Sequence, residues 1–146
     1  MRHLTAKFDS GSGNKNHGSR SGIIGVTQLR RVAVLATARR VAFELGVGLG
    51  KEVGFQVRHD KRIGDSCSIK FITDGILLRE LQNDFLLKRY SSIILDEAHE
   101  RSLNTDILTG MLSHVIVERQ KIHEQQNAYE VSTGKRLSLT RYIHYD

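Results

Sequence analysis

The sequence predicts an α/β protein whose parallel sheet is covered by helices on both faces. Short apolar runs typical of buried strands alternate with segments of helical periodicity along most of the chain. The predicted order is strand–helix–strand–strand–helix–strand–helix, and right-handed crossovers turn this order into a three-layer parallel sheet. The predicted strands are residues 22–28, 53–57, 68–73 and 90–95, and the predicted helices are residues 30–45, 74–83 and 104–120.

The first helix follows the strand over 22–28 directly. Its apolar residues recur on one stripe, and Gly46 is a plausible C-terminal stop. The residues expected to face the core are Val34, Ala38, Val41, Ala42 and Leu45.

In the middle of the chain, the apolar patterns predict two strands that are separated by a charged turn region at 58–65. The helix over 74–83 should bury Ile76, Leu77 and Leu81, with Asp74 as its N-cap.

The helix over 104–120 has the clearest apolar face, after which the periodicity fades. We therefore expect a flexible leader over 1–21, a partial domain over 22–120 and a polar tail or insertion over 121–146. The expected core residues of the last helix are Ile107, Leu108, Met111, Leu112, Val115 and Ile116.

Composition restricts the class of protein. The 146 residues carry 22 Lys and Arg against 16 Asp and Glu, a net charge of +6 that permits a nucleic-acid partner. The single cysteine, Cys67, excludes an internal disulfide framework. No apolar run reaches the length of a membrane span, so we expect a soluble, intracellular protein with no membrane partner.

Two adjacent carboxylates follow the strand over 90–95. Ligands of open α/β sheets gather beyond the carboxyl ends of the strands, where Asp96 and Glu97 should lie. One carboxylate there can hold Mg²⁺ through water, and the other can orient or deprotonate a water molecule. The alternative is that Asp96 only caps a helix, with Glu97 and His99 on a solvated turn.

Two further strand-to-helix corners carry polar residues. The first offers hydroxyl, amide and guanidinium groups to a phosphate, and its alternative is a solvated basic turn. The second follows the strand over 68–73, and helix capping alone would explain its aspartate. The first corner consists of Thr27, Gln28, Arg30 and Arg31, and the second of Thr73, Asp74 and Gly75.

A phosphate-binding loop of the form G-x-x-x-x-G-K-[ST] is absent from the sequence. Gly13 is followed by Asn14, and Gly50-Lys51 by Glu52. The sequence thus has candidate magnesium and water-activating groups but no matching lysine.

These motifs together resemble the DEAH-box RNA helicases. The segment Asp96-Glu97-Ala98-His99 resembles the signature of that family, and the two corners resemble its RNA-contacting motifs in the same order. The likeness covers roughly 22–117, and the residues of its motifs are most similar to those of the nucleolar, ribosome-assembly branch. It implies an incomplete RecA-like domain of the P-loop NTPase class and a nuclear, nucleolar protein that couples ATP hydrolysis to RNA remodelling.

The resemblance assigns roles residue by residue. Asp96 would hold Mg²⁺ through water, Glu97 would activate the hydrolytic water, and His99 would link the nucleotide site to a facing domain. The two corners would bind single-stranded RNA through its backbone, without sequence preference. Ribosome-assembly factors would be further partners. The RNA-binding residues would be Thr27, Gln28, Arg30, Arg31, Thr73, Asp74 and Gly75.

The sequence departs from the family pattern at several points. Leu29 stands where family members carry proline, and neither the phosphate-loop lysine nor a second RecA-like domain is present. We therefore expect this chain alone to be inactive and to expose an apolar slot on its sheet. A non-catalytic RNA-binding adaptor is the alternative function, and a DNA helicase of similar fold is a third.

Overall fold

The computed structural model describes residues 4–7, 22–100, 102–133 and 144–145. Its centre is a seven-stranded sheet in the order β4-β3-β5-β2-β6-β1-β7. The strands are β1 (Leu4–Lys7), β2 (Ile23–Gln28), β3 (Val53–Val57), β4 (Asp60–Arg62), β5 (Ile69–Thr73), β6 (Tyr90–Leu95) and β7 (His144–Tyr145). The helices are α1 (Arg31–Glu44), α2 (Asp74–Asn83), the 3₁₀ turn η1 (Ala98–Glu100) and α3 (Leu103–Thr133).

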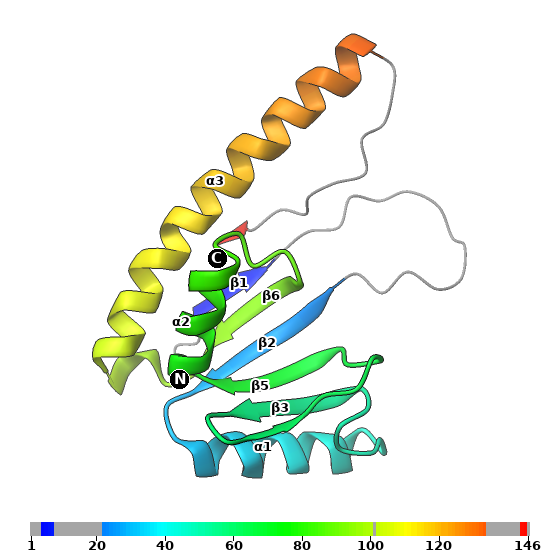
Figure 1. The fold of residues 1–146 in the computed structure, drawn as a ribbon, viewed down its shortest axis with the longest axis vertical. Helices are drawn as coiled ribbons and strands as arrows, with labels where there is room; N and C mark the ends of the chain where they lie inside the picture. Colours follow the sequence, from blue (N-terminus) through cyan, green and yellow to red (C-terminus); the bar gives the residue numbers. More distant parts are fainter. Residues whose placement is uncertain (1–3, 8–21, 101, 134–143, 146) are drawn as a thin grey trace.

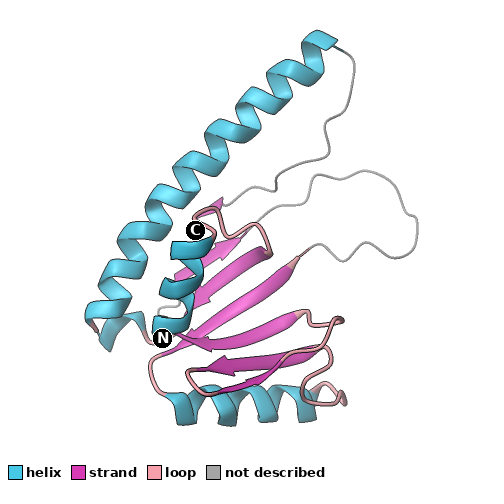
Figure 2. Cartoon of the chain, viewed as in Figure 1, coloured by secondary structure: helices cyan, strands magenta, loops and turns pink. Residues whose placement is uncertain are grey.

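The predicted three layers are confirmed. Helix α1 lies on one face of the sheet, and α2 and α3 lie on the other, as Figures 1 and 2 show. Each face has its own apolar core. On the α1 face, residues such as Val34, Ala38 and Phe71 are buried, and on the other face Leu77, Ile93 and Leu108 are buried.

The sheet is parallel at its centre and antiparallel at its edges, which corrects the prediction of an all-parallel sheet. Strands β3, β5, β2 and β6 run parallel, whereas β4 pairs antiparallel with β3 and β1 with β6. Strand β4 lies inside the predicted turn region because a two-residue connection, Arg58-His59, can only fold back as an antiparallel hairpin.

Two element predictions at the ends of the chain were wrong. Leu4–Lys7 forms β1, although residues 1–21 were expected to be a flexible leader, and residues 8–21 lie outside the described ranges. Helix α3 continues to Thr133 rather than ending near 120. Its distal part is polar and exposed, so the helix extends without a buried face to predict it.

Helix α1 ends as the sequence indicates. Gly46 has a φ of +65°, its N–H bonds the carbonyl of Phe43, and the N–H of Val47 bonds the carbonyl of Ala42. These two hydrogen bonds together form the Schellman motif. Leu45, expected in the core, is 56% exposed because it follows the last helical turn.

Candidate functional site

The carboxyl ends of β2, β5 and β6 meet at one edge of the sheet (Figure 1). Parallel pairing sets Gln28 beside Thr73 and Thr27 beside Leu95, the residue before Asp96. The two polar corners and the carboxylate pair, which are distant in the sequence, are therefore neighbours in space. The candidate site is this edge, which is formed by the carboxyl ends of β2, β5 and β6 and not by an outer strand of the sheet.

Asp96, which follows β6, is hydrogen-bonded to the last residue of the neighbouring strand β2. Its Oδ2 accepts a hydrogen bond of 2.6 Å from Nε2 of Gln28, and its Oδ1 accepts one of 2.9 Å from the N–H of Glu97. A helix cap would bond N–H groups two or three residues further on. The bond to Gln28 instead joins Asp96 to the first corner.

Glu97 is exposed and has a φ of +56°, in the left-handed region that residues other than glycine rarely adopt. Such a conformation persists only where the surroundings hold it, and it is frequent at functional sites. It turns the chain sharply after β6, so Glu97 leaves the line of the strand at the sheet edge. His99 lies in η1, and its side chain is outside the described residues.

The first corner divides into buried and exposed groups. Thr27 and Gln28 are 1% and 4% exposed, whereas Arg30 and Arg31 are exposed at the start of α1. Arg30 occupies the N-cap position of α1 in extended conformation and makes no side-chain cap hydrogen bond. The two guanidinium groups are thus the accessible cations of this corner.

The second corner is tied to α3. Asp74 is 4% exposed, and its Oδ2 accepts a hydrogen bond of 2.7 Å from Oγ1 of Thr105. The N-cap of α2 is Thr73, so the prediction that Asp74 caps the helix was wrong by one residue. Gly75 is exposed.

Sequence reasoning missed three polar partners at this edge. Neither Ser102 nor Thr105 was considered for a polar contact, and Gln28 was read only as an RNA contact. A serine three residues before a threonine at a helix start is a recognisable capping pattern, and the N–H of Thr105 does bond Oγ of Ser102 at 3.1 Å. The Gln28–Asp96 contact spans 68 positions, so only the sheet register reveals it.

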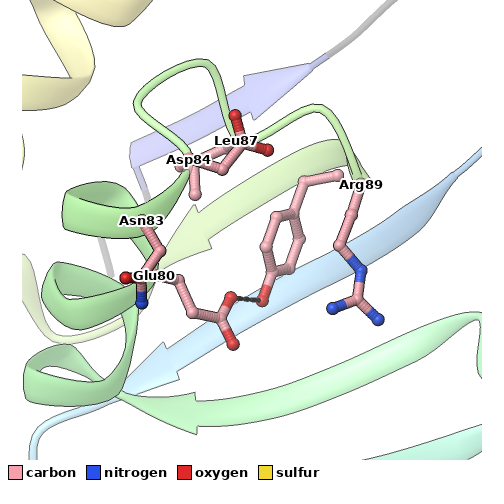
Figure 3. Close-up of a pocket in the computed structure, with 6 residues that line it drawn as sticks. Glu80, Asn83, Asp84, Leu87 and Arg89 are labelled. Carbon is pink, nitrogen blue, oxygen red and sulfur yellow. Dashed lines mark hydrogen bonds between the residues drawn. The ribbon is translucent and has the colours of Figure 1, made fainter.

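A separate pocket of about 180 Å³ lies beside the first residue of β6, at the opposite end of that strand from Asp96. In it Glu80 accepts a hydrogen bond of 2.5 Å from the hydroxyl of Tyr90, drawn as a dashed line in Figure 3. Lys70, 5% exposed, bonds both groups. The pocket is lined by Glu80, Asn83, Asp84, Leu87, Arg89 and Tyr90.

Burial governs ionisation in this cluster. It lowers the pKa of Lys70, against the opposing hydrogen bond and charge of Glu80. Burial, with the charge of Glu80, raises the pKa of Tyr90 well above its ordinary value. Because Lys70, Glu80 and Tyr90 satisfy one another, we interpret the cluster as structural.

Within the part of the chain that the structure describes, no three His, Cys, Asp or Glu side chains gather closely enough to hold a metal ion. Nor does any described helix combine the length and apolar character needed to cross a membrane.

The fold and this edge define the class of protein. A sheet that is parallel at its centre and lies between helical layers, with a carboxylate pair beyond β6 and polar corners beside it, matches the incomplete RecA-like domain that the sequence predicts. No family model matches the chain. Comparison with individual proteins, however, gives clear relatives.

The relatives are DEAH-box and related RNA helicases. The chain is 75% identical over 127 residues to the ATP-dependent RNA helicase DEAH13 of Arabidopsis thaliana, covering 87% of this chain and 10% of that protein. It is 49% identical over 118 residues to the probable ATP-dependent RNA helicase DHR1 of Saccharomyces cerevisiae, covering 81% and 9%. The human probable ATP-dependent RNA helicase DHX37 is 50% identical over 103 residues, covering 70% and 9%.

The chain belongs to the DEAH-box RNA helicase family, and it spans about a tenth of the length of these relatives.

Proposed function

We propose that this segment is the part of an ATP-dependent RNA helicase that joins an RNA-binding edge to the groups that hydrolyse ATP. The observation that carries the proposal is the shared edge, where Gln28 of the first corner bonds Asp96 of the carboxylate pair. RNA contacts and hydrolytic groups built on neighbouring strands can act on one another. The relatives' names, which state ATP-dependent RNA helicases, support the same function.

The residues at the edge fit a magnesium ion. Mg²⁺ keeps most of its water and takes one or two carboxylates, with phosphates as further ligands. Asp96 supplies one such carboxylate, partly buried at a strand end. A carboxylate offers about four acceptor sites, so one carboxylate can accept hydrogen bonds from the protein and also bind the water shell of a cation.

The roles proposed for the chain are those that the resemblance to DEAH-box helicases implies. Bound Mg²⁺ would neutralise developing charge on the phosphates of ATP. Asp96 would hold the ion through water, exposed Glu97 would orient and deprotonate the attacking water, and His99 would link this site to a facing domain.

For RNA we propose a division of work between the corner residues. Arg30, Arg31 and Gly75 are exposed and would contact the backbone of a single strand, with Thr73 at their border. Thr27 and Asp74 are buried and would support the corners from within. Contacts of this kind make binding tolerant of sequence and sensitive to salt.

Two finer proposals concern the whole protein. We propose a nucleolar role in ribosome biogenesis, together with assembly factors, because the motif wording resembles that branch. We also propose that these 146 residues alone do not hydrolyse ATP, because they contain no phosphate-loop lysine.

The test of hydrolysis uses the full-length helicase that carries this segment. Glu97→Gln should lower RNA-stimulated ATP turnover by about 10²–10⁴-fold, the usual contribution of a general base. Glu124→Gln, an exposed change on distal α3, is the matched control and should have no effect. Equal turnover by the wild type and Glu97→Gln would overturn the role given to Glu97.

The test of RNA binding compares two double variants, each of which removes two arginine charges, either at the start of α1 or further along it. Replacing Arg30 and Arg31 by alanine should weaken RNA binding. It should also make the plot of log binding constant against log salt concentration less steep by about 1.4, because each phosphate contact on a single strand contributes about 0.7 to that slope. Replacing Arg39 and Arg40, also exposed on α1, removes the same charge away from the edge. If both double variants weaken binding equally, the proposed RNA edge is wrong.

The adaptor is the second candidate function, and the absent phosphate-loop motif is what favours it. It requires that these 146 residues alone bind RNA in a salt-sensitive manner, and that loss of Arg30 and Arg31 weaken this binding. No RNA binding by this chain at low salt would exclude it.

A further inference from the structure

The side chain of Gln28 lies inside the molecule. It is 4% exposed, on the last residue of β2, and it follows the partly buried Val26 on the face that α1 covers. A backbone contact with RNA needs an accessible group, and Gln28 does not offer one. Its amide is instead committed to Asp96 at 2.6 Å.

The bond fixes the orientation of the carboxylate. Asp96 follows β6 directly, and β2 is the parallel neighbour of that strand, so Gln28 and Asp96 are adjacent across the sheet. A hydrogen bond to an ionised acceptor is about twice as strong as a neutral one. With Oδ2 held by Gln28 and Oδ1 by the N–H of Glu97, rotation of the carboxylate is opposed at both oxygens.

We infer that Gln28 is a positioning residue for Asp96, through which the RNA-binding corner acts on the nucleotide site. The inference rests on the proposed function and revises the role that the sequence suggested for Gln28. Arg30 and Arg31 follow Gln28 by two and three residues. A shift of the corner on RNA binding therefore moves Gln28, and with it the carboxylate that would hold Mg²⁺.

The coupling is reciprocal. If RNA raises the affinity for Mg²⁺–nucleotide through Gln28, Mg²⁺–nucleotide must raise the affinity for RNA by the same factor. Loss of the amide removes both effects but leaves the exposed arginines in place. This separates a positioning residue from an RNA contact.

The experiment uses the full-length helicase with Gln28→Leu, and with Gln28→Glu as a second variant of similar size. Gln56→Leu, a partly buried strand glutamine on β3, is the control. Binding of a fluorescent non-hydrolysable ATP analogue is titrated with Mg²⁺, with and without a single-stranded RNA. RNA binding is also measured without nucleotide, and circular dichroism checks folding.

For Gln28→Leu we expect the half-saturating Mg²⁺ concentration to rise about 10–100-fold, as when the partner of a metal ligand is lost. Gln28→Glu places a second carboxylate beside Asp96, so this variant tests only the loss of the amide donor. RNA binding without nucleotide should equal that of the wild type, and the RNA effect on nucleotide binding should disappear. Gln56→Leu should match the wild type throughout.

Two results would overturn the inference. Weaker RNA binding without nucleotide, at unchanged Mg²⁺ dependence, would make Gln28 an RNA contact. Unchanged behaviour in every assay would leave the hydrogen bond without a role. In both cases the loss of turnover in Glu97→Gln still stands, so the proposed function survives. A wild-type protein that binds no Mg²⁺–nucleotide would overturn both.

Discussion

Thr105, in the first turn of α3, donates a hydrogen bond of 2.7 Å from Oγ1 to Oδ2 of Asp74, the first residue of α2. Both residues are buried, at 6% and 4% exposure. Helix α2 begins within the second corner, and α3 follows the carboxylate pair by way of η1. The bond therefore fastens the starts of the two helices that leave the candidate site.

Thr105→Val should destabilise the fold. Valine keeps the shape but removes the donor, which leaves a buried carboxylate oxygen of Asp74 without this partner and costs about 1–3 kcal/mol. Urea unfolding of the 146-residue chain measures the loss. Thr109→Val is the control, because Oγ1 of Thr109 bonds the carbonyl of Thr105 within the same helix and no other group among the described residues. Equal losses in both variants would contradict a special role for the Asp74 bond.

Gly54→Ala should destabilise the β3–β4 hairpin. A Cβ at Gly54 would lie 2.7 Å from the carbonyl oxygen of Arg62, which is backbone and cannot turn away. We expect a cost of about 1–3 kcal/mol, typical of overpacking. In Gly110→Ala the new Cβ meets nothing within 4 Å, and the helix should gain up to about 1 kcal/mol. The prediction fails if thermal unfolding shifts in the same direction for both.

The sequence predicted some elements to the residue. Helix 74–83 and strands 53–57 and 90–95 match α2, β3 and β6, because local apolar patterns and buried faces agree there. Strand β4 consists of three exposed polar residues that become a strand only by pairing with β3. Ile107, expected in the core, is 43% exposed, so the buried seam of α3 is narrower than its apolar pattern.

The candidate site was predicted in its parts but not in its connections. Residue order and strand ends identified both corners and Asp96, since motifs are local in sequence. Contacts such as Gln28–Asp96 and Asp74–Thr105 join segments 68 and 31 positions apart. They depend on register and helix packing, which no local pattern reports.

Tyr90→Phe should change how stability depends on pH. Burial raises the pKa of Tyr90 above the ordinary value near 10, so the folded chain keeps a proton that the unfolded chain loses. The stability from Tyr90 is therefore full below about pH 10 and falls by up to about 1.4 kcal/mol per pH unit above it. The lowered pKa of Lys70 acts in the opposite direction, because its contribution rises as pH approaches its ordinary value of 10.5.

Urea unfolding between pH 8 and about pH 11 measures this dependence. The variant loses the bond to Glu80, about 1 kcal/mol at pH 8, but its stability should fall less steeply above pH 10. An unchanged alkaline slope in Tyr90→Phe would show that Tyr90 ionises normally.

Neighbouring residues of β6 should respond very differently to truncation, because they face opposite sides of the sheet. Ile93 is 0% exposed, in the apolar core beneath α2 and α3. Ile94 and Ile24 are partly buried, and among the described residues they pack against neither of the two apolar cores. Ile93→Ala should cost about 2–5 kcal/mol. Ile94→Ala removes less buried surface and should cost under about 1 kcal/mol, while lowering the fluorescence of a bound apolar dye. Equal costs in urea unfolding, with no dye bound by the wild type, would mean that this face of β6 is covered, and the apolar slot expected from the sequence would not exist.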